Sequence, residues 1–295
     1  MKCRKIKIKR EKMKENKSKF RDNFIWVCFV AFVIMLLGGI LVEWIPKGST
    51  SFTKVFLLYF KFIGAMITTF LLIILVDKNK YILKYMGNKV KGNSFKMLFL
   101  SILIGFLLNG VSILVAYLNG DIKLTFSMFQ PLPLLAIFVA VFIQSSTEEI
   151  LCRGFVYRRL INGYKSPWVA IIINPIFFAA LHITNSGVSP LAIYNLFIYG
   201  LLMSLIVYYT DSLWMVMGIH TMWNFTQNII FGLPNSGLKA EYSIFKLTES
   251  TKNITFAYDP SFGVEGTILT VIILTALTVL LYYFGKNGVK NGCEI

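Results

Sequence analysis

The chain has 295 residues, of which 56% are apolar and only 15% are charged. Soluble domains usually carry about 25% charged residues. A soluble core of this size could not bury so much apolar side chain, so lipid is the expected solvent. The composition therefore excludes an ordinary soluble domain and predicts an all-α, polytopic membrane protein.

Apolar runs recur along the chain at the length that a membrane helix needs, about 20 residues. Two of these runs are shorter or more polar than the rest, so the sequence predicts seven or eight transmembrane helices, with eight favoured. The runs lie near 24–45, 55–76, 97–117, 133–157, 168–184, 190–209, 213–231 and 266–284.

The net charge of +16 is distributed unevenly along the chain. Residues 1–22 hold eleven Lys and Arg, and the segment 77–96 holds six more. With the N-terminus inside and eight crossings, the cytoplasmic segments carry 22 Lys and Arg and the outer segments carry six. Such basic segments stay cytoplasmic, and a basic tail binds anionic lipid headgroups. We therefore expect a multi-pass protein of the cell membrane, with both termini cytoplasmic, the lipid bilayer as its partner and no nucleic-acid partner.

The fourth apolar run contains ionisable side chains, which are costly in a membrane helix and usually mark function. Two adjacent carboxylates, Glu148 and Glu149, are followed by Arg153. Glu149 and Arg153 are four residues apart with the acid first, which is the favourable orientation for an ion pair on one helix face. Glu148 lies about 100° around the helix from Glu149 and has no local partner. Glu148 is therefore the carboxylate that we predict to be free for chemistry.

Both histidines of the chain lie in other apolar runs. His182 belongs to the fifth run, and His220 belongs to the seventh, with Asn224 one turn later on the same helix face. From the helical rise, Glu148, His182 and His220 lie at depths of about 15, 21 and 14 Å, which helix tilt can reconcile. One such histidine alone could simply form a hydrogen bond that joins two helices. Two histidines with an unpaired glutamate and an asparagine favour a functional site instead.

These residue types predict hydrolysis of a peptide bond. Glu148 can take a proton from a water held between it and His182, and the resulting nucleophile attacks a carbonyl carbon. N–H donors on His220 and Asn224 can stabilise the oxyanion. Ser145 and Ser146 adjoin Glu148, but hydroxyls in membrane helices commonly bond to their own backbone.

Three short motifs, in this order and on separate predicted helices, resemble those of a known family. They are Glu148-Glu149-x-x-x-Arg153, Phe178-x-x-x-His182 and His220-x-x-x-Asn224. The motifs are similar to those of the CPBP family, the CAAX prenyl proteases and bacteriocin-processing enzymes that are also called Abi proteins. The resemblance covers residues 133–230.

The resemblance implies an eight-helix intramembrane protease whose active site lies in a core of helices four to seven, in a cavity open to one side of the membrane. It implies that Glu148 and His182 activate the water and that His220 and Asn224 form the oxyanion site. Glu149 and Arg153 would be a structural pair, with Phe178 packed beside the site.

The cofactor stays open at this point. A glutamate mechanism without metal is one alternative, and zinc held by Glu148, His182 and His220 is the other, since three such ligands leave a fourth position open. The chain lacks the His-Glu-x-x-His helix of many zinc proteases, which favours the absence of a metal.

The expected substrate is a membrane-associated peptide or protein, cleaved in peptide maturation or bacteriocin immunity. A non-catalytic membrane immunity or interaction protein is an alternative, in which the motifs would only pack helices. A proton-coupled transporter is another, because Glu and His chains also form proton relays. The complete set of motifs argues against the first, and the lack of paired Gly/Pro-interrupted helices argues against the second.

The chain shows no soluble domain, and we expect five regions along it. They are a basic cytoplasmic tail, N-terminal transmembrane helices, a CPBP-like catalytic core, an extracytoplasmic loop with irregular structure, and the last helix with its tail. Their bounds are 1–22, 23–130, 131–232, 233–265 and 266–295.

Overall fold

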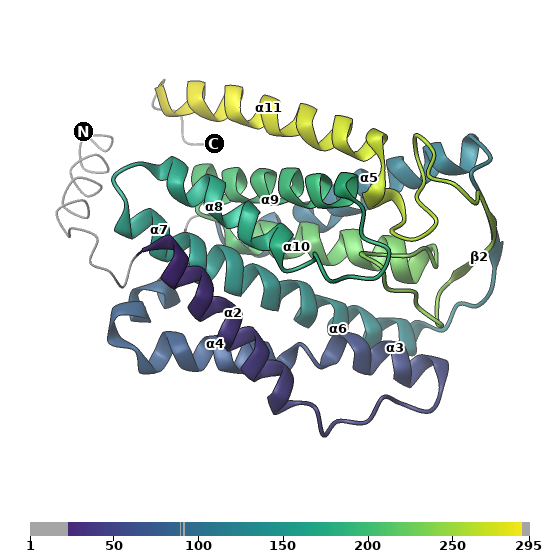
Figure 1. Cartoon of the computed structure of the whole chain (residues 1–295), viewed down its shortest axis with the longest axis horizontal. Helices are drawn as coiled ribbons and strands as arrows, with labels where there is room; N and C mark the ends of the chain where they lie inside the picture. Colours follow the sequence, from purple (N-terminus) through teal and green to yellow (C-terminus); the bar gives the residue numbers. More distant parts are fainter. Residues whose placement is uncertain (1–22, 89, 91, 291–295) are drawn as a thin grey trace.

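A computed structural model describes residues 23–290 except residues 89 and 91. The predicted basic tail, residues 1–22, lies outside the described residues. Within them the protein is a bundle of helices with a two-stranded sheet at one end (Figure 1). This arrangement confirms the predicted all-α polytopic class and shows, in addition, a small sheet.

Local sequence signals set where most of the helices begin. Side-chain oxygens of Asn23, Ser94, Ser189 and Ser212 cap four helices by accepting first-turn backbone N–H groups. Three helices have a proline in the first turn, where its missing N–H costs nothing. The α-helices are α2 (Phe24–Leu41), α3 (Ser51–Phe60), α4 (Ile63–Leu75), α5 (Phe95–Leu118), α6 (Pro131–Glu149), α7 (Tyr157–Gly163), α8 (Pro167–Ala180), α9 (Pro190–Thr210), α10 (Leu213–Asn224) and α11 (Ile268–Lys290).

Helix is present in every one of the eight predicted runs, but not every run is a long apolar helix. In the described part of the chain, six helical segments are long and apolar enough to cross a membrane, with α3–α4 and α6–α7 each counted as one. The other two are α8, which has only 14 residues, and α10. α10 is largely buried among other helices, and half of the α8 residues are buried, so neither needs a continuous apolar surface toward lipid.

The fifth predicted helix ends earlier than expected. The sequence predicts helix up to residue 184, whereas α8 ends at Ala180 and the chain then enters consecutive turns. The Leu181 and His182 amides still bond back to Phe177 and Ala179, and Gly187 adopts a left-handed φ of 73°. His182 therefore lies in a turn past the helix end and not within the helix.

The fourth predicted helix is longer than expected and changes its geometry midway. α6 continues as a π-helical segment, η3 (Ile150–Val156), and then as α7. Together these elements run from Pro131 to Gly163 through the middle of the bundle (Figure 1). The π-helix begins directly after the two adjacent glutamates. Such segments are rare in proteins, but those that occur are often found at functional sites.

One side of the bundle is formed by α2, α3 and α4 (Figure 1). α2 and α4 approach closely because both have a glycine at the crossing: a Cβ on Gly38 would overlap the backbone of Ala65, and one on Gly64 would overlap that of Gly38. Small residues allow such close helix contact in membranes. On the other side lie α8, α9 and α10, with α11 outermost.

The end of the bundle that carries the sheet is formed by loops. β1 (Ile122–Phe126) pairs antiparallel with β2 (Phe245–Ser250), from Ile122 opposite Ser250 to Phe126 opposite Phe245. β2 belongs to the predicted irregular loop, which also contains the short 3-10 helix η5 (Val264–Gly266). Two more non-α segments complete the order, the 3-10 helix η2 (Asp77–Tyr85) and the π-helical η4 (Phe225–Ile230).

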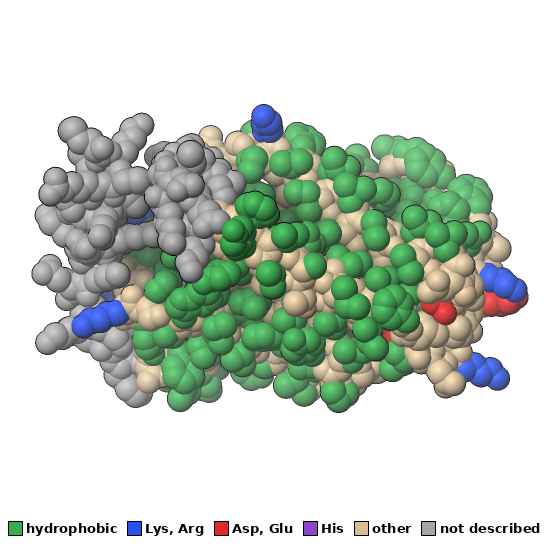
Figure 2. Space-filling view, turned by 90° about the horizontal axis from the view of Figure 1, so that it is seen from above, with side chains coloured by type: hydrophobic (Ala, Val, Ile, Leu, Met, Phe, Trp, Pro, Cys, Tyr) green, Lys and Arg blue, Asp and Glu red, His purple; other side chains and the backbone are tan. Residues whose placement is uncertain are grey.

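The outer surface is apolar over most of the length of the bundle. Figure 2 shows one face on which hydrophobic side chains cover the middle, while the few charged side chains in view lie mostly near the ends. Large apolar side chains such as Phe95, Phe99 and Leu118 are more than half exposed. A soluble protein rarely exposes so much apolar surface, so the described residues form a membrane protein.

Candidate active site

Glu149 and Arg153 form a fully buried ion pair. Arg153 Nη1 donates to Glu149 Oε1 over 3.0 Å, and both side chains are completely inaccessible. The guanidinium also donates to the Gly200 carbonyl over 3.2 Å and lies over the ring of Phe178, with Cζ 4.6 Å from the ring centroid. A buried charge requires such partners. The pair therefore joins α6, η3, α8 and α9 beside the site.

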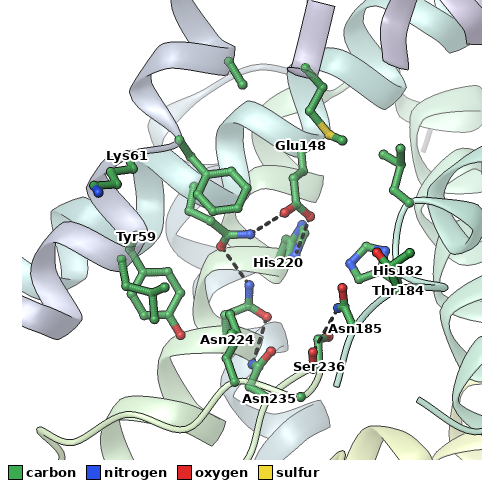
Figure 3. A pocket seen from close by; sticks show the side chains of 18 of the residues that line it. Tyr59, Lys61, Glu148, His182, Thr184, Asn185, His220, Asn224, Asn235 and Ser236 are labelled. Carbon is green, nitrogen blue, oxygen red and sulfur yellow. Dashed lines mark hydrogen bonds and ion pairs between the residues drawn. The ribbon is translucent and has the colours of Figure 1, made fainter. Parts of the chain in front are cut away.

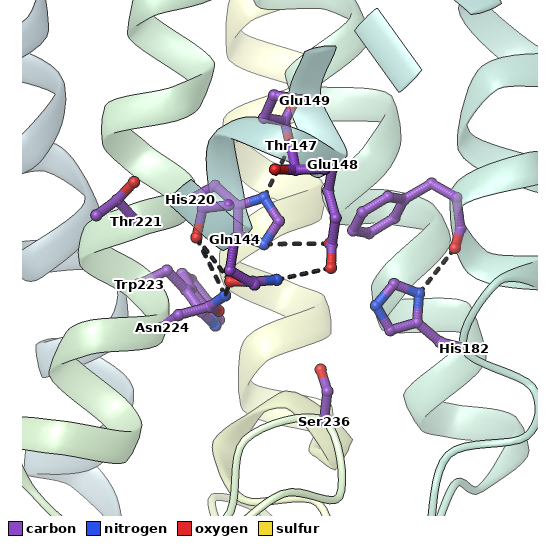
Figure 4. Close-up of polar contacts among 12 residues, drawn as sticks. Gln144, Thr147, Glu148, Glu149, His182, His220, Thr221, Trp223, Asn224 and Ser236 are labelled. Atoms are coloured by element: carbon purple, nitrogen blue, oxygen red, sulfur yellow. Dashed lines mark hydrogen bonds and ion pairs between the residues drawn. The ribbon is translucent and has the colours of Figure 1, made fainter. Parts of the chain in front are cut away.

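Glu149 also orients His220. The same oxygen that accepts from Arg153 lies 2.9 Å from Nδ1 of His220. A carboxylate only accepts hydrogen bonds, so Nδ1 carries the proton and Nε2 points the other way. Nε2 lies 3.8 Å from Oε2 of Glu148 (Figure 4). His220 is thus held between two carboxylates, one of which fixes its ring while the other lies beside its free nitrogen.

Glu148 keeps one carboxylate oxygen free among the described residues. Its Oε1 accepts from Gln144 Nε2 over 2.6 Å, whereas Oε2 has no hydrogen-bond partner there. The side chain is 14% exposed, in contrast to the inaccessible Glu149. Because Glu148 lines the cavity and its Oε2 is not committed to a donor, the carboxylate can accept a proton from a bound water.

His182 faces Glu148 from the turn after α8 (Figure 4). Its Nδ1 lies 2.8 Å from the carbonyl oxygen of Phe178. A carbonyl can only accept, so Nδ1 donates and Nε2 of the neutral ring is an acceptor. The rings of Phe178 and His182 pack with centroids 4.8 Å apart. Phe178 therefore lies between Arg153 and His182 and helps to set the position of both.

Asn224 belongs to a chain of amides that ends at Glu148. Gln144 donates to Glu148, and its oxygen accepts from Asn224 Nδ2 over 3.0 Å. Asn224 Oδ1 in turn accepts from Asn235 Nδ2 over 3.1 Å. Because the Glu148 carboxylate can only accept hydrogen bonds, it fixes the orientation of the three side-chain amides that follow it, Gln144, Asn224 and Asn235. We call Glu148, Gln144, Asn224 and Asn235 the amide relay.

The hydrogen bonds of the relay restrict the predicted role of Asn224 as an oxyanion donor. Its amide nitrogen already donates to Gln144, and a longer contact of 3.4 Å joins it to Ser145 Oγ. An oxyanion donor must point at the reacting carbonyl oxygen. Asn224 can therefore serve as a donor only by exchanging the longer contact with Ser145 for a substrate.

Two relay members carry no role in the sequence-based interpretation. Gln144 stands four residues before Glu148, so helical spacing places it on the same face. That spacing could have identified it. Asn235 lies in a loop, where an asparagine is ordinary, and the sequence holds no signal that points to it.

The predicted site residues line one cavity. Glu148, His182, His220 and Asn224 all face a space of about 940 Å³ between α2–α4 on one side and α8–α10 on the other (Figure 3). Apolar side chains make up much of its wall, and polar groups are concentrated at the relay and the histidines. A concave, mostly apolar space with a few convergent polar groups is typical of a binding site.

The zinc alternative does not fit the arrangement of the described residues. Within residues 23–290, apart from 89 and 91, no three His, Cys, Asp or Glu side chains are grouped so that they could hold one metal ion. A zinc ion bound by Glu148, His182 and His220 is therefore not supported.

Comparison with known families identifies the same segment. Residues 130–226 match the family described as type II CAAX prenyl endopeptidase Rce1-like. The match begins just before α6 and ends in η4, so it contains Glu148, His182, His220 and Asn224 but not Asn235. It confirms the family resemblance predicted from the three motifs. A comparison with curated proteins gives no match.

Proposed function

Because residues 130–226 match the Rce1-like CAAX prenyl endopeptidases, we propose that this membrane protein is an intramembrane endopeptidase. One observation carries the proposal: the Glu148 side chain and the acceptor nitrogen of His182 face each other on the wall of one cavity within the helical bundle (Figure 4). A water between these two acceptors can direct one hydrogen to each, which leaves its lone pair for attack.

The reaction can be written with the residues of this chain. Glu148 takes a proton from the water, and the water oxygen bonds to the carbonyl carbon of the substrate. Protonated His220 donates from Nε2 to the oxyanion, and the Glu149 carboxylate beside its Nδ1 favours its positive charge. Glu148 then gives its proton to the leaving nitrogen, the C–N bond breaks, and a carboxyl and an amine are released.

The cavity wall supports a membrane-associated peptide, or a peptide with a lipidated C-terminus, as the substrate. Met35 and Gly39 of α2, and Val42 directly after the helix, line the cavity, with Phe62 and Ala65 beside them. These apolar groups can cover an apolar substituent of the substrate, while the polar groups contact the scissile peptide. Burial of apolar surface would supply most of the binding free energy.

The test is turnover of membrane-tethered peptides by the purified protein in lipid nanodiscs, with product termini mapped by mass spectrometry. The Glu148→Gln variant, purified in parallel, is the control, and each reaction is run with and without a chelator. New termini that appear only with the native protein support the proposal. Loss of cleavage with chelator would assign a metal to the reaction, and no cleavage by folded native protein would favour a binding role.

Gly39→Leu is expected to narrow the apolar side of the cavity. Nothing lies within 4 Å of a Cβ added at Gly39, so the leucine enters the cavity without displacing a neighbour. We expect about a tenfold loss of kcat/KM for substrates with a bulky apolar group and a smaller loss for those without one. The matched control is Gly110→Leu in α5, where an added Cβ also meets open space but outside the cavity. Equal effects of the two variants would contradict this use of the α2 wall.

A further inference from the structure

A tight turn at residues 235–238 forms the floor of the site, although it lies beyond the matched segment. Asn235 and Leu238 exchange backbone hydrogen bonds of 2.8 Å, which close the turn. Asn235 donates to Asn224 in the amide relay, and Ser236 lies beneath Glu148 and beside His182 (Figures 3 and 4). The turn therefore provides the last member of the relay.

The turn has an unfavourable backbone conformation. Ser236 has a φ of 45°, one of two left-handed residues other than glycine in the described segments. Such a residue persists only where its surroundings hold it. Here the Ser236 N–H and Oγ donate to Glu265 Oε2 over 2.7 and 2.8 Å, and its carbonyl accepts from Asn185 over 2.9 Å.

Glu265 is the buried group that makes these contacts. Its side chain comes from η5, and the residue is 6% exposed. Oε1 accepts from the indole N–H of Trp223 over 2.8 Å, while Oε2 accepts from Ser236. Burial raises the pKa of Glu265, and the hydrogen bonds from Ser236 and Trp223 oppose that rise.

The chemistry of the two donors requires a carboxylate at this position. An indole N–H and a peptide N–H can only donate, and they address different oxygens of Glu265. An amide has one oxygen and one NH2 group, so glutamine would leave one of these N–H groups facing another donor. A buried donor without an acceptor is strongly unfavourable.

We propose that Glu265 is a positioning residue for catalysis, which holds the 235–238 turn against Asn224 and thereby fixes the amide relay and the Glu148 carboxylate. This inference rests on the proposed endopeptidase function. Glu265 does not contact Glu148 directly in this arrangement, so its effect passes through Ser236, Asn235, Asn224 and Gln144.

The first experiment compares Glu265→Gln with the native protein in the peptide cleavage assay. We expect kcat to fall by about 10- to 100-fold with KM little changed, because the loss concerns the orientation of the relay and not substrate contact. Glu249→Gln is the matched control, since Glu249 is an exposed carboxylate in β2 paired with Lys123. An unchanged kcat for Glu265→Gln would overturn the proposal.

A second-site variant separates positioning from general damage to the fold. In a Trp223→Phe background the indole donor is gone, so the glutamine introduced by Glu265→Gln can turn its oxygen to Ser236 with no donor opposite its NH2 group. Glu265→Gln should therefore cost less activity in that background than in the native protein, which a double-mutant cycle measures. Additive losses would overturn the proposal.

Hydrogen–deuterium exchange provides a readout that does not depend on cleavage. In Glu265→Gln the peptide covering residues 232–240 should exchange faster, while the peptides of α6 keep their native protection. If the native protein cleaves nothing, the proposed function fails, yet faster exchange would still show that Glu265 holds the turn. Native exchange at 232–240 in the variant would overturn the role of Glu265 even if the protease is active.

Discussion

Glu148→Gln is expected to reduce peptide cleavage by about 10²- to 10⁴-fold, the range that general acid–base groups contribute. The amide cannot take a proton from water, and its NH2 group would occupy the position of the free Oε2. Glutamine has nearly the same shape as glutamate and can still accept from Gln144 through its oxygen. The variant should therefore keep the native fold and lose only the chemistry.

The measurement is single-turnover cleavage, with thermal unfolding in detergent as the check on folding. Glu241→Gln is the matched control, because Glu241 is an exposed carboxylate that pairs with Lys54 over 3.0 Å. It should retain native activity. A Glu148→Gln protein that cleaves as fast as the native one would rule out Glu148 as the base and, with it, the mechanism proposed for this site.

The ionisable site residues could be predicted from the sequence because they are out of place in apolar runs. Glu148, His182 and His220 stand in apolar runs, where an ionisable side chain is costly and needs a reason. The same argument could not identify Glu265 or the 235–238 turn with Asn235. Those residues lie in a loop whose polar composition is ordinary, and only tertiary contacts bring them to Glu148.

The limits of prediction for the fold have a similar cause. In the described part of the chain, each of the eight apolar runs contains helix, because burial in lipid or in protein selects the same apolar side chains. It could not show that α8 ends before His182 or that the helix turns into a π-helix after Glu149, since both depend on local hydrogen bonds. The pairing of β1 with β2 joins segments far apart in the chain, and neither strand is long enough to stand out in sequence.

Arg153→Met is expected to destabilise the protein by about 3–5 kcal/mol, because it leaves the Glu149 carboxylate without its cation in a fully buried place. Methionine has a similar length and can remain against the ring of Phe178, so the loss of packing is small. The free energy of unfolding can be measured by SDS titration in mixed micelles.

The decisive test of the Glu149–Arg153 pair is a double-mutant cycle that combines Arg153→Met with Glu149→Gln. The double variant Glu149→Gln/Arg153→Met removes both buried charges together, so it should lose much less stability than the sum of the single variants. It should also retain an acceptor for His220 Nδ1, because the glutamine oxygen can replace Oε1 of Glu149. Additive losses would mean that the two charges do not stabilise each other, and that Glu149 is kept for His220 alone.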